Sequence, residues 1–443
     1  MAFHQRGQLV QAQALYADLL KIQPKQVDAL YLLGVIAGQT GDHGRAIDLI
    51  GKAIEIKPDN PLFYYNLGVA FKELKQYDAA AESYRKAIAI KPDYAQAHSN
   101  CGIALKELGQ VGPALASYDR AIAIKPDYAE AYWNKAVALL LSGDFDQGWA
   151  LHEWRWRRDK AAARNFRQPL WLGKEAVAGK TILLHGEQGL GDTIQFCRYA
   201  SLVADLGARV VLEVQPPLLD VLKQLTGVSE WVAAGAALPE FDIHCPLLSL
   251  PLAFNTRLDA IPASAQYLAA NADKLTLWEG RLGRKAGPRI GLVWSGSSAH
   301  KKDHDRSVLL SALLAQLPAD FQYVSLQKEV REIDRTALES SGKILHFGDQ
   351  LRDFNDTAAL CELMDLVISV DTSVAHLSGA LGKRTWLLLP FVPDWRWLLD
   401  REDSPWYPSA KLIRQPAAGD WESVFAKVGA DLAQLAAAFP VSP

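Results

Sequence analysis

The stretch DLVISVDTSVAHLSGALGK, residues 365–383, decides how the larger part of this chain is interpreted. An apolar run, residues 366–370, predicts a buried strand that ends at Asp371. Small hydrogen-bonding side chains and glycines follow it: Thr372, Ser373, His376, Gly379 and Gly382. A buried strand that leads directly into a helix is typical of the βαβ units of a parallel sheet.

Strands and helices alternate on both sides of this stretch, from residue 180 almost to the end of the 443-residue chain. The predicted strands are TILLHG at 181–186, ARVVLEV at 208–214, FDIHCP at 241–246, RIGLVWSG at 289–296, FQYVSLQ at 321–327 and RTWLLLP at 384–390. Helices are predicted between them, at 192–204, 217–224, 307–317 and 357–364. Glycines, a proline and charge in RLGRKAGPRI place a boundary near residue 285. We expect two α/β domains, 180–285 and 286–443, the second with a C-terminal helix, and strand ends that face a common cleft.

The first third of the chain is a periodic repeat, and prolines mark the period at positions 24, 58, 92 and 126. The same sequence, IKPD, surrounds the last three prolines. Between them, apolar residues at helical spacing predict two helices per unit, and small residues such as Gly68 and Ala80 let the two approach closely. In length and pattern the units resemble the tetratricopeptide (TPR) repeat. We expect an α-solenoid at residues 1–155, followed by a junction at 156–179.

Asparagines hold the same place in three consecutive units, at Asn66, Asn100 and Asn134. On stacked first helices they would form a ladder along the concave groove, where carboxamides suit an extended peptide backbone. An acceptor polypeptide is one interpretation of this ladder. The other is that asparagine at this place pins neighbouring helices, and the repeats alone do not decide between the two.

The opening stretch places hydrogen-bonding groups where a phosphate binds well. Asp371 ends a strand, Thr372 and Ser373 begin the next helix, and His376 lies one turn further on. A helix start leaves backbone N–H groups unpaired and carries partial positive charge, so it favours an anion. The alternative is that one of these residues only caps the helix. We favour phosphate binding, because a cap does not require three such residues and a histidine.

A second anion site is expected where the strand RIGLVWSG ends in Ser295 and Gly296. Arg306, Lys301 and Lys302 follow, and an arginine can bind a diphosphate through two parallel hydrogen bonds. A solvated loop is the alternative interpretation for the two lysines. The nearby His300, Asp303, His304 and Asp305 match no standard metal-site spacing, so no metal is expected.

In the first α/β domain, HGEQGLGDTIQF joins a strand to its helix and carries two carboxylates, Glu187 and Asp192. Either could take a proton from an attacking hydroxyl, while Asp192 is also a good helix-capping residue. The loop has neither the full GxGxxG spacing nor a Walker lysine. Aromatic residues crowd PFVPDWRWLLDREDSPWYP, residues 390–408, where they serve either as core or as a stacking surface for sugars or bases. We favour the core.

The composition narrows the function classes. Basic residues number 47 and acidic residues 50, so no strong field points to nucleic acid or an anionic membrane. Four cysteines, at 101, 197, 245 and 361, form no CxxC pair, which suits a reducing compartment. The start, MAFHQRGQLV, lacks a signal-peptide core, and no apolar run reaches the ~20 residues that span a bilayer. We expect a cytoplasmic protein without a membrane span.

Two of these motifs resemble a known enzyme family. DTSVAHLSGALGK, residues 371–383, resembles the donor-site signature of glycosyltransferase family 9, the bacterial heptosyltransferases, and GLGDTIQF, residues 189–196, resembles the Gly-Asp loop of that family. The resemblance covers roughly residues 180–425. With its TPR array, the whole chain is similar to protein O-GlcNAc transferases and to bacterial flagellin glycosyltransferases, and GWALHEWRWR, residues 148–157, is similar to their junction segments.

The resemblance implies a GT-B enzyme, with two Rossmann-like domains, that is inverting and metal-independent and uses a nucleotide-sugar donor without a cofactor. Its donor site would comprise Ser295, Gly296, Arg306, Gln327, Lys328, Asp371, Thr372, Ser373 and His376, with Gln327 and Lys328 near the nucleoside. Asp192, or else Glu187, would be the catalytic base. Heptosyltransferases have no TPR array, so their lipid-core acceptor is not implied, and no preference for UDP-GlcNAc is carried over.

We therefore expect a protein O-glycosyltransferase whose TPR groove selects the acceptor polypeptide, with flagellin as one candidate substrate. The alternative is transfer to a glycan or glycolipid, with the repeats recruiting a partner. A third hypothesis is a TPR scaffold whose α/β domains are inactive. A UDP-sugar is the first donor to test; the donor, the acceptor and the oligomeric state stay open.

Overall fold

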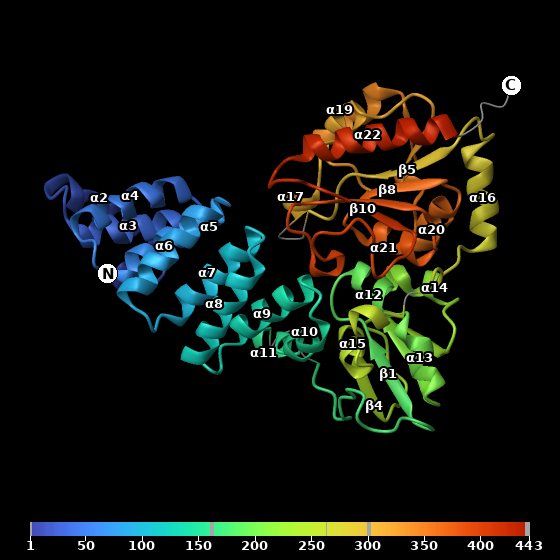
Figure 1. Ribbon diagram of the computed structural model, residues 1–443, viewed down its shortest axis with the longest axis horizontal. Coiled ribbons are helices and arrows are strands. Elements are labelled where there is room, and N and C mark those ends of the chain that lie inside the picture. The colour runs from blue at the N-terminus through green and yellow to red at the C-terminus, as the bar shows by residue number, and fades with distance from the viewer. Residues whose placement is uncertain (1, 160–163, 263, 299–302, 439–443) are drawn as a thin grey trace. The chain divides into compact units, whose positions relative to one another are not determined.

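The computed structural model describes residues 2–159, 164–262, 264–298 and 303–438. By its internal contacts the chain divides into two compact units near residue 161, one helical and one with parallel sheets (Figure 1). Each unit is described by itself.

The first unit consists of paired antiparallel helices that keep the period of the prolines. The long first helices of four hairpins begin at Val27, Pro61, Ala95 and Ala129, which are evenly spaced along the chain. The solenoid predicted from the prolines is therefore confirmed. Its helices are α1 (Ala2–Gln5), α2 (Leu9–Ile22), α3 (Val27–Gln39), α4 (His43–Ile56), α5 (Pro61–Glu73), α6 (Tyr77–Ile90), α7 (Ala95–Glu107), α8 (Val111–Ile124), α9 (Ala129–Leu141), α10 (Phe145–His152) and α11 (Arg155–Arg158).

Glycine allows the two helices of each hairpin to touch. A Cβ atom on Gly102 of α7 would lie 2.6 Å from the Cε1 atom of Tyr118 on α8, and one on Gly68 of α5 would lie 2.7 Å from the same atom of Tyr84. Both tyrosine rings are fully buried, so they cannot move away. The small side chain at this place thus sets the helix spacing, as the sequence pattern predicts.

The second unit contains two sheets, and all strand pairs within them are parallel. The four-stranded sheet has the order β3-β2-β1-β4, and the six-stranded sheet has the order β10-β9-β8-β5-β6-β7. The strands are β1 (Thr181–His185), β2 (Arg209–Val214), β3 (Val228–Ala233), β4 (Ile243–Pro246), β5 (Arg289–Val293), β6 (Gln322–Ser325), β7 (Ile344–His346), β8 (Leu366–Val370), β9 (Thr385–Leu389) and β10 (Ala410–Arg414).

Helices cover both faces of the six-stranded sheet, with α19 and α22 on one side and α20 and α21 on the other (Figure 1). Residues of α22 join the buried cluster of β5 and β8, so the predicted C-terminal helix closes this core. The helices of the unit are α12 (Leu190–Phe196), α13 (Tyr199–Asp205), α14 (Leu219–Leu222), α15 (Leu250–Ala253), α16 (Ala272–Leu282), α17 (Asp303–Arg306), α18 (Leu310–Leu314), α19 (Glu332–Ser341), α20 (Phe354–Glu362), α21 (Ser373–Ala380) and α22 (Trp421–Ala438). Short 3₁₀ turns are η1 (Pro216–Leu218), η2 (Leu247–Ser249), η3 (Leu258–Ala260), η4 (Gly348–Gln350) and η5 (Trp395–Trp397).

Three strands, β3, β7 and β10, were not predicted from the sequence, and all three lie at sheet edges. An edge strand is covered less completely, so it lacks the continuous apolar run of a central parallel strand. The helix predicted at 192–204 was also wrong as a single element, because it consists of two short helices, α12 and α13. Between them, the Arg198 side chain bonds back to the carbonyl of Gln195 at 2.8 Å.

Two segments next to the predicted boundaries pack into the sheets. Within the predicted junction, the backbone of Trp171 donates to the carbonyl of His244 at 2.8 Å, which places this segment beside β4. Lys274 and Trp278 of α16 both bond to the carboxylate of Asp356 on α20, at 2.8 and 3.0 Å. The helix that precedes residue 285 therefore packs with the six-stranded sheet. No described helix is long and apolar enough to cross a membrane.

Replacing Gly102 by alanine should destabilise the helical unit, because overpacking against the buried Tyr118 ring costs about 1–3 kcal/mol. Gly51, inside α4, has nothing within 4 Å of the place that a Cβ atom would take, so Gly51→Ala should stabilise the protein by about 0.5–1 kcal/mol. Chemical unfolding followed by circular dichroism measures both. Equal effects of the two substitutions would show that helix propensity, rather than helix spacing, governs these positions.

Candidate functional site

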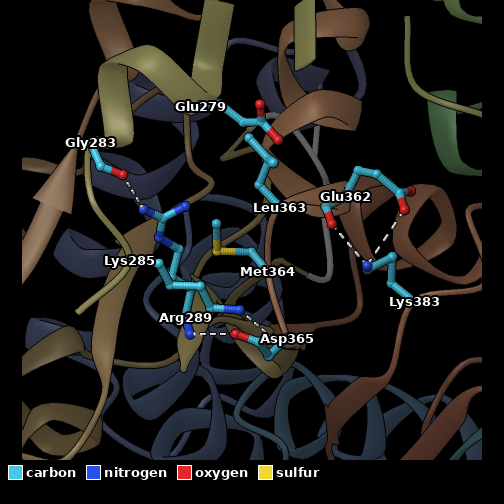
Figure 2. Close-up of a pocket in the computed structure, with 9 residues that line it drawn as sticks. All are labelled: Glu279, Gly283, Lys285, Arg289, Glu362, Leu363, Met364, Asp365 and Lys383. Carbon is cyan, nitrogen blue, oxygen red and sulfur yellow. Dashed lines mark hydrogen bonds and ion pairs between the residues drawn. The ribbon is translucent and has the colours of Figure 1, made fainter. Parts of the chain in front are cut away.

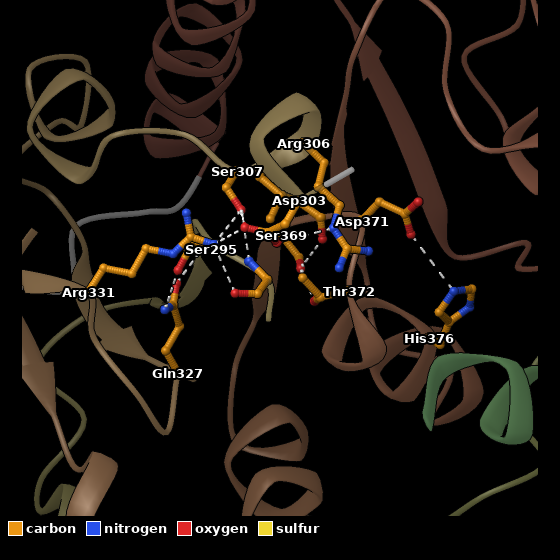
Figure 3. A network of polar contacts seen from close by, with 12 residues as sticks. Ser295, Asp303, Arg306, Ser307, Gln327, Arg331, Ser369, Asp371, Thr372 and His376 are labelled. Atoms are coloured by element: carbon orange, nitrogen blue, oxygen red, sulfur yellow. Dashed lines mark hydrogen bonds and ion pairs between the residues drawn. The ribbon is translucent and has the colours of Figure 1, made fainter. Parts of the chain in front are cut away.

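The predicted anion-binding groups meet at one edge of the six-stranded sheet. Strands β5 and β8 are hydrogen-bonded neighbours and run parallel, so both end at the same edge. Ser295 and Gly296 follow β5, and Asp371 and Thr372 follow β8. Figure 3 shows these loops side by side, with Arg306 between them. Groups that are far apart in the sequence thus line one small region.

The start of α21 has no side-chain cap. Thr372 occupies the capping position, yet its side chain accepts no hydrogen bond from the first turn of the helix. Its hydroxyl lies 3.3 Å from the Ser369 hydroxyl instead. Among the described residues, no acceptor is found for the backbone amides of Ser373 and Val374. The capping interpretation therefore does not hold for Thr372, and the helix start has amide donors to offer an anion.

A buried charge cluster shapes the loop after β5. Arg331 donates to the carbonyl of Gly296 at 3.0 Å and to the Ser307 hydroxyl at 3.1 Å, and it forms an ion pair with Asp303. A Cβ atom at Gly296 would lie 2.5 Å from Asp303 Oδ1 and 2.8 Å from Arg306 Nη2, so a larger residue there would displace these two side chains. Arg331 was not predicted from the sequence, since an arginine in a polar loop gives no local signal.

Arg306 lies close enough to the start of α21 to act on the charge of Asp371. Its Nε atom is buried and lies 3.5 Å from Asp303 Oδ1, beyond a normal hydrogen bond. The guanidinium is directed toward the Asp371–Thr372 turn (Figure 3). Lys301, Lys302 and His300 lie outside the described residues. Arg306 can therefore supply positive charge to an anion at this edge.

Gln327 and Lys328 differ in their surroundings. The Gln327 side chain is buried, accepts from the backbone amides of Trp294 and Ser295 at 2.7 and 2.9 Å, and donates to the Ser295 hydroxyl at 2.9 Å. Its carboxamide is therefore occupied in holding the end of β5. Lys328, the next residue, is exposed.

His376 is enclosed rather than open to a ligand. Its Nδ1 atom lies 2.9 Å from the Tyr407 hydroxyl, its ring stacks on Trp397 with centroids 5.3 Å apart, and a Cβ atom at Gly191 would lie 2.6 Å from its Cδ2 atom. Burial and, next, the charge of Arg396 lower the pKa of His376 to about 3. The imidazole is therefore neutral near pH 7 and adds no positive charge to an anion site.

Asp371 follows β8, and its surroundings make the charged form of its side chain unfavourable. Its Oδ1 atom lies 3.8 Å from the Nε2 atom of His376. Burial, followed by the nearby Asp394 carboxylate, raises the pKa of Asp371 to about 6, although Arg306 acts in the opposite direction. Near neutral pH the site thus holds a carboxylate that the fold disfavours as a charge.

His376 packs against Gly191 in the first turn of α12, and the two candidate catalytic carboxylates lie in and just before this helix. Asp192 is in the first turn of α12, and its Oδ2 atom accepts from the Gly189 amide at 2.8 Å. The N-cap position predicted for Asp192 is occupied by Gly189, and Asp192 bonds back to it from the third helical position. The other carboxylate oxygen forms an ion pair with Arg396. Glu187 is half-buried in the loop after β1.

The aromatic segment 390–408 forms core, the interpretation that its sequence favours. Trp395, Trp397, Trp406 and Tyr407 are each at most 4% exposed. Phe196 of α12 stacks on Trp395, with ring centroids 6.3 Å apart, and packs edge-on against Trp406. These rings therefore join the two sheets and are not free to stack on a sugar.

The asparagine ladder is mostly internal. The Nδ2 atom of Asn66 donates to the Tyr31 hydroxyl at 2.7 Å, and that of Asn100 donates to the Tyr65 hydroxyl at 3.1 Å, so both pin neighbouring hairpins. At Asn134 the pattern breaks, because Ser99 stands where a tyrosine would be. No acceptor for the buried Asn134 Nδ2 atom occurs in the described part of the chain.

A separate hollow of about 460 Å³ lies at the other edge of the six-stranded sheet, where the strands begin (Figure 2). Its charges pair with each other: Lys285 with Asp365 at 2.7 Å, and Lys383 with the Glu362 carboxylate at 3.6 Å. It therefore presents less unpaired charge than the edge at α21. Within the described ranges, no group of three or more metal-binding side chains comes together.

Comparison with known proteins supports the helical unit in particular. The TPR repeat family matches residues 39–75, 70–109 and 104–143, so the N-terminal part consists of TPR repeats. The chain is also similar to protein FlbA of Caulobacter vibrioides, with 24% identity over 332 residues that cover 67% of this chain and 54% of that protein. The chain thus spans about half the length of this curated relative.

Solved TPR structures overlap the chain only partly. A crystal structure of MamA is 25% identical and covers 36% of this chain and 94% of its own, with a TM-score of 0.34. The structure of YrrB, described as a TPR protein with an unusual peptide-binding site, is 20% identical and covers 36% of this chain and 87% of its own, with a TM-score of 0.32.

Replacing Asp371 by asparagine should stabilise the protein at pH 8 and have little effect near pH 4. The folded pKa of about 6 lies above the ordinary value of 3.8, so folding favours the protonated acid and this contribution is lost as the pH rises through 6. The gain at pH 8 is at most about 3 kcal/mol. Thermal unfolding of both proteins between pH 4 and 8 measures it.

Asp365→Asn is the matched control for that experiment. Asp365 bonds to Lys285 and to the Arg289 amide, both at 2.7 Å, so its loss should lower the unfolding temperature at pH 8. If Asp371→Asn lowers the unfolding temperature in the same way, the Asp371 charge is stabilising and our account of the site is wrong.

Proposed function

We propose that this chain is an inverting, metal-independent glycosyltransferase of the GT-B class that moves a sugar from a nucleotide sugar to a hydroxyl group of a protein. The observation that carries the proposal is the uncapped start of α21 at the carboxyl edge of a parallel sheet, with Arg306 beside it. Ligands of open parallel sheets bind at this edge.

The donor's diphosphate would bind at the start of α21. The amides of Ser373 and Val374 and the Thr372 hydroxyl provide donors, and Arg306 provides a permanent positive charge. Fixed donors of this kind stabilise the charge that develops on a leaving diphosphate. Ser295 and Gly296 would line the same site, shaped from behind by Gln327 and Arg331. Lys328 is exposed beside this network.

The transfer step requires a base on the other side of the anomeric carbon. The acceptor oxygen forms a bond to that carbon, the bond to the diphosphate oxygen breaks, and the nucleoside diphosphate leaves with the electron pair. The acceptor's proton passes to a carboxylate. Asp192 is our first candidate, because its loop meets the second sheet where Gly191 touches His376; Glu187 is the second.

The TPR unit would select the acceptor polypeptide. TPR stacks provide extended binding surfaces. Asn66 and Asn100 are occupied by tyrosine hydroxyls, whereas the Nδ2 atom of Asn134 has no acceptor among the described residues. Asn134 is therefore the member of the ladder whose amide group is not already paired, and we assign the acceptor contact to it; the contact requires that its buried Nδ2 atom becomes exposed when a peptide binds.

Donor binding should appear as a thermal shift. UDP, GDP, ADP, CMP and dTDP, and sugar conjugates of each, are tested first, beginning with UDP-sugars. A ligand at 100 times its dissociation constant adds about 2.7 kcal/mol, which corresponds to several degrees at roughly 2–4 °C per kcal/mol. Arg306→Ala should abolish the shift, while Lys285→Ala at the other edge should retain it. If no nucleotide shifts the unfolding temperature, an inactive TPR scaffold becomes the better account.

Acceptor selection is tested with Asn134→Ala and Asn100→Ala. With a Ser/Thr peptide library as acceptor, Asn134→Ala should raise KM about tenfold, the equivalent of one hydrogen bond of roughly 1.4 kcal/mol, and leave the unfolding temperature unchanged. Asn100→Ala should lower the unfolding temperature, because it loses the bond to Tyr65. Efficient transfer to small glycans by both variants, with none to peptides, would favour the glycan-directed alternative.

A further inference from the structure

Two buried arginines connect the two halves of the second unit. Arg198 extends from the first half to the second, and Arg396 extends from the second half to the first. Arg198, at the start of α13, donates to the Trp406 carbonyl at 2.8 Å and to the Tyr267 hydroxyl at 3.1 Å. Arg396, in η5, donates to Gln195 of α12 at 2.7 Å and forms an ion pair with Asp192. Each arginine is at most 7% exposed, so neither contact is a mobile surface pair.

The partners of the two arginines differ in charge. Arg198 contacts backbone carbonyls, a hydroxyl and aromatic faces. Its Cζ atom lies 4.6 Å from the ring centroid of Tyr267 and 4.8 Å from that of Tyr407. Arg396 meets two carboxylates, Asp192 across the sheet junction and Asp394 on its own segment at 2.7 Å. Only the second arginine, of these two, holds a candidate catalytic group.

The Asp192 carboxylate is fixed from both sides. Its Oδ2 atom is bound to the Gly189 amide at 2.8 Å, and its Oδ1 atom is held by Arg396. The adjacent Gly191 leaves no room for a side chain against His376. A carboxylate held by two partners on different elements keeps one orientation, which proton transfer in a defined geometry requires.

A buried guanidinium stays charged in these surroundings. Burial alone would lower the pKa of Arg396, but Asp394 and Asp192 more than offset this, and the pKa is raised. Replacing the arginine by a neutral side chain would remove the counter-charge that both carboxylates contact. The position of Asp192 therefore depends on a residue 204 positions away in the sequence.

We propose that Arg396 is a positioning residue for sugar transfer: it holds the Asp192 carboxylate, from the second sheet, in the orientation in which that group accepts the acceptor's proton. This inference rests on the proposed function and assigns Arg396 a part in it. Asp394 shares the guanidinium and keeps it from turning away from Asp192. Arg198, by contrast, braces the same junction without contacting a carboxylate.

The test compares Arg396→Gln, Arg396→Lys and the control Arg198→Gln in the full chain, with UDP-glucose and UDP-N-acetylglucosamine as donors and a Ser/Thr peptide library as acceptor. Arg396→Gln should lower kcat about 100-fold, the effect of a misplacement of ~1 Å, with donor KM changed less than about threefold. Arg396→Lys should recover about tenfold of the lost kcat, because an ammonium group still pairs with Asp192. Arg198→Gln should lower the unfolding temperature and leave kcat within about threefold.

A double-mutant cycle adds a measurement that needs no activity. If Arg396 and Asp192 are paired as described, the losses in unfolding temperature of Arg396→Gln and Asp192→Asn should be less than additive in the double variant. Additive losses would overturn the inference, and so would an Arg396→Gln variant that keeps the kcat of an active wild type or loses no more than Arg198→Gln. A wild type that binds no donor and transfers no sugar would overturn the proposed function itself.

Discussion

The second unit depends on the burial of the Arg396 charge between two parallel sheets. Burying a guanidinium is costly unless other groups offset the loss of hydration, and for Arg396 a carboxylate comes from each side of the junction, Asp192 and Asp394. This requirement keeps the loop before α12 against the segment that contains η5. The aromatic rings of residues 395–407 then fill the space around the charge and exclude water. The two sheets consequently belong to one compact unit and are packed together beside the site.

The same burial determines what each charged group at the site can do. His376 is kept neutral by its surroundings and serves as a packing and hydrogen-bonding group against Tyr407 and Gly191. Burial makes the charged form of Asp371 unfavourable. An anion that binds at the start of α21 therefore needs the positive charge of Arg306 and the hydrogen bonds of the backbone amides. The positive character of this edge therefore comes from the helix start and one arginine, and not from the histidine that the motif displays most conspicuously.

The fully buried strands of the fold could be predicted from the sequence, and the partly buried edge strands could not. The regular period of the hairpins and the continuous apolar runs of β1, β5 and β8 are strong signals, because repetition and full burial both leave a pattern along the chain. Strands β3, β7 and β10 leave no such pattern because they are only partly buried, whereas the edge strand β4 is fully buried and was predicted.

The site shows a similar division. Ser295, Arg306 and Thr372 could be brought together in advance, because parallel neighbours end at one edge. The ion pair between Asp192 and Arg396 joins residues 204 positions apart and has no local signature in the sequence. The hydrogen bond from the Trp294 amide to the Gln327 side chain has none either. Motif spacing therefore predicts well which loops meet, and poorly which side chains within them are already occupied.

The spacing of the helical hairpins has a consequence for how such a chain can change. The first helices begin at equal intervals along the chain, and the two helices of a hairpin touch through the same glycine and tyrosine positions in successive units. A duplication or loss of one whole repeat would then reproduce the same helix-to-helix contacts on both sides of the change. The solenoid can thus lengthen or shorten in whole repeats without requiring compensating substitutions in the sheets. Gene rearrangement could adjust the reach of the helical surface in fixed steps, while the residues around α21 stay unchanged.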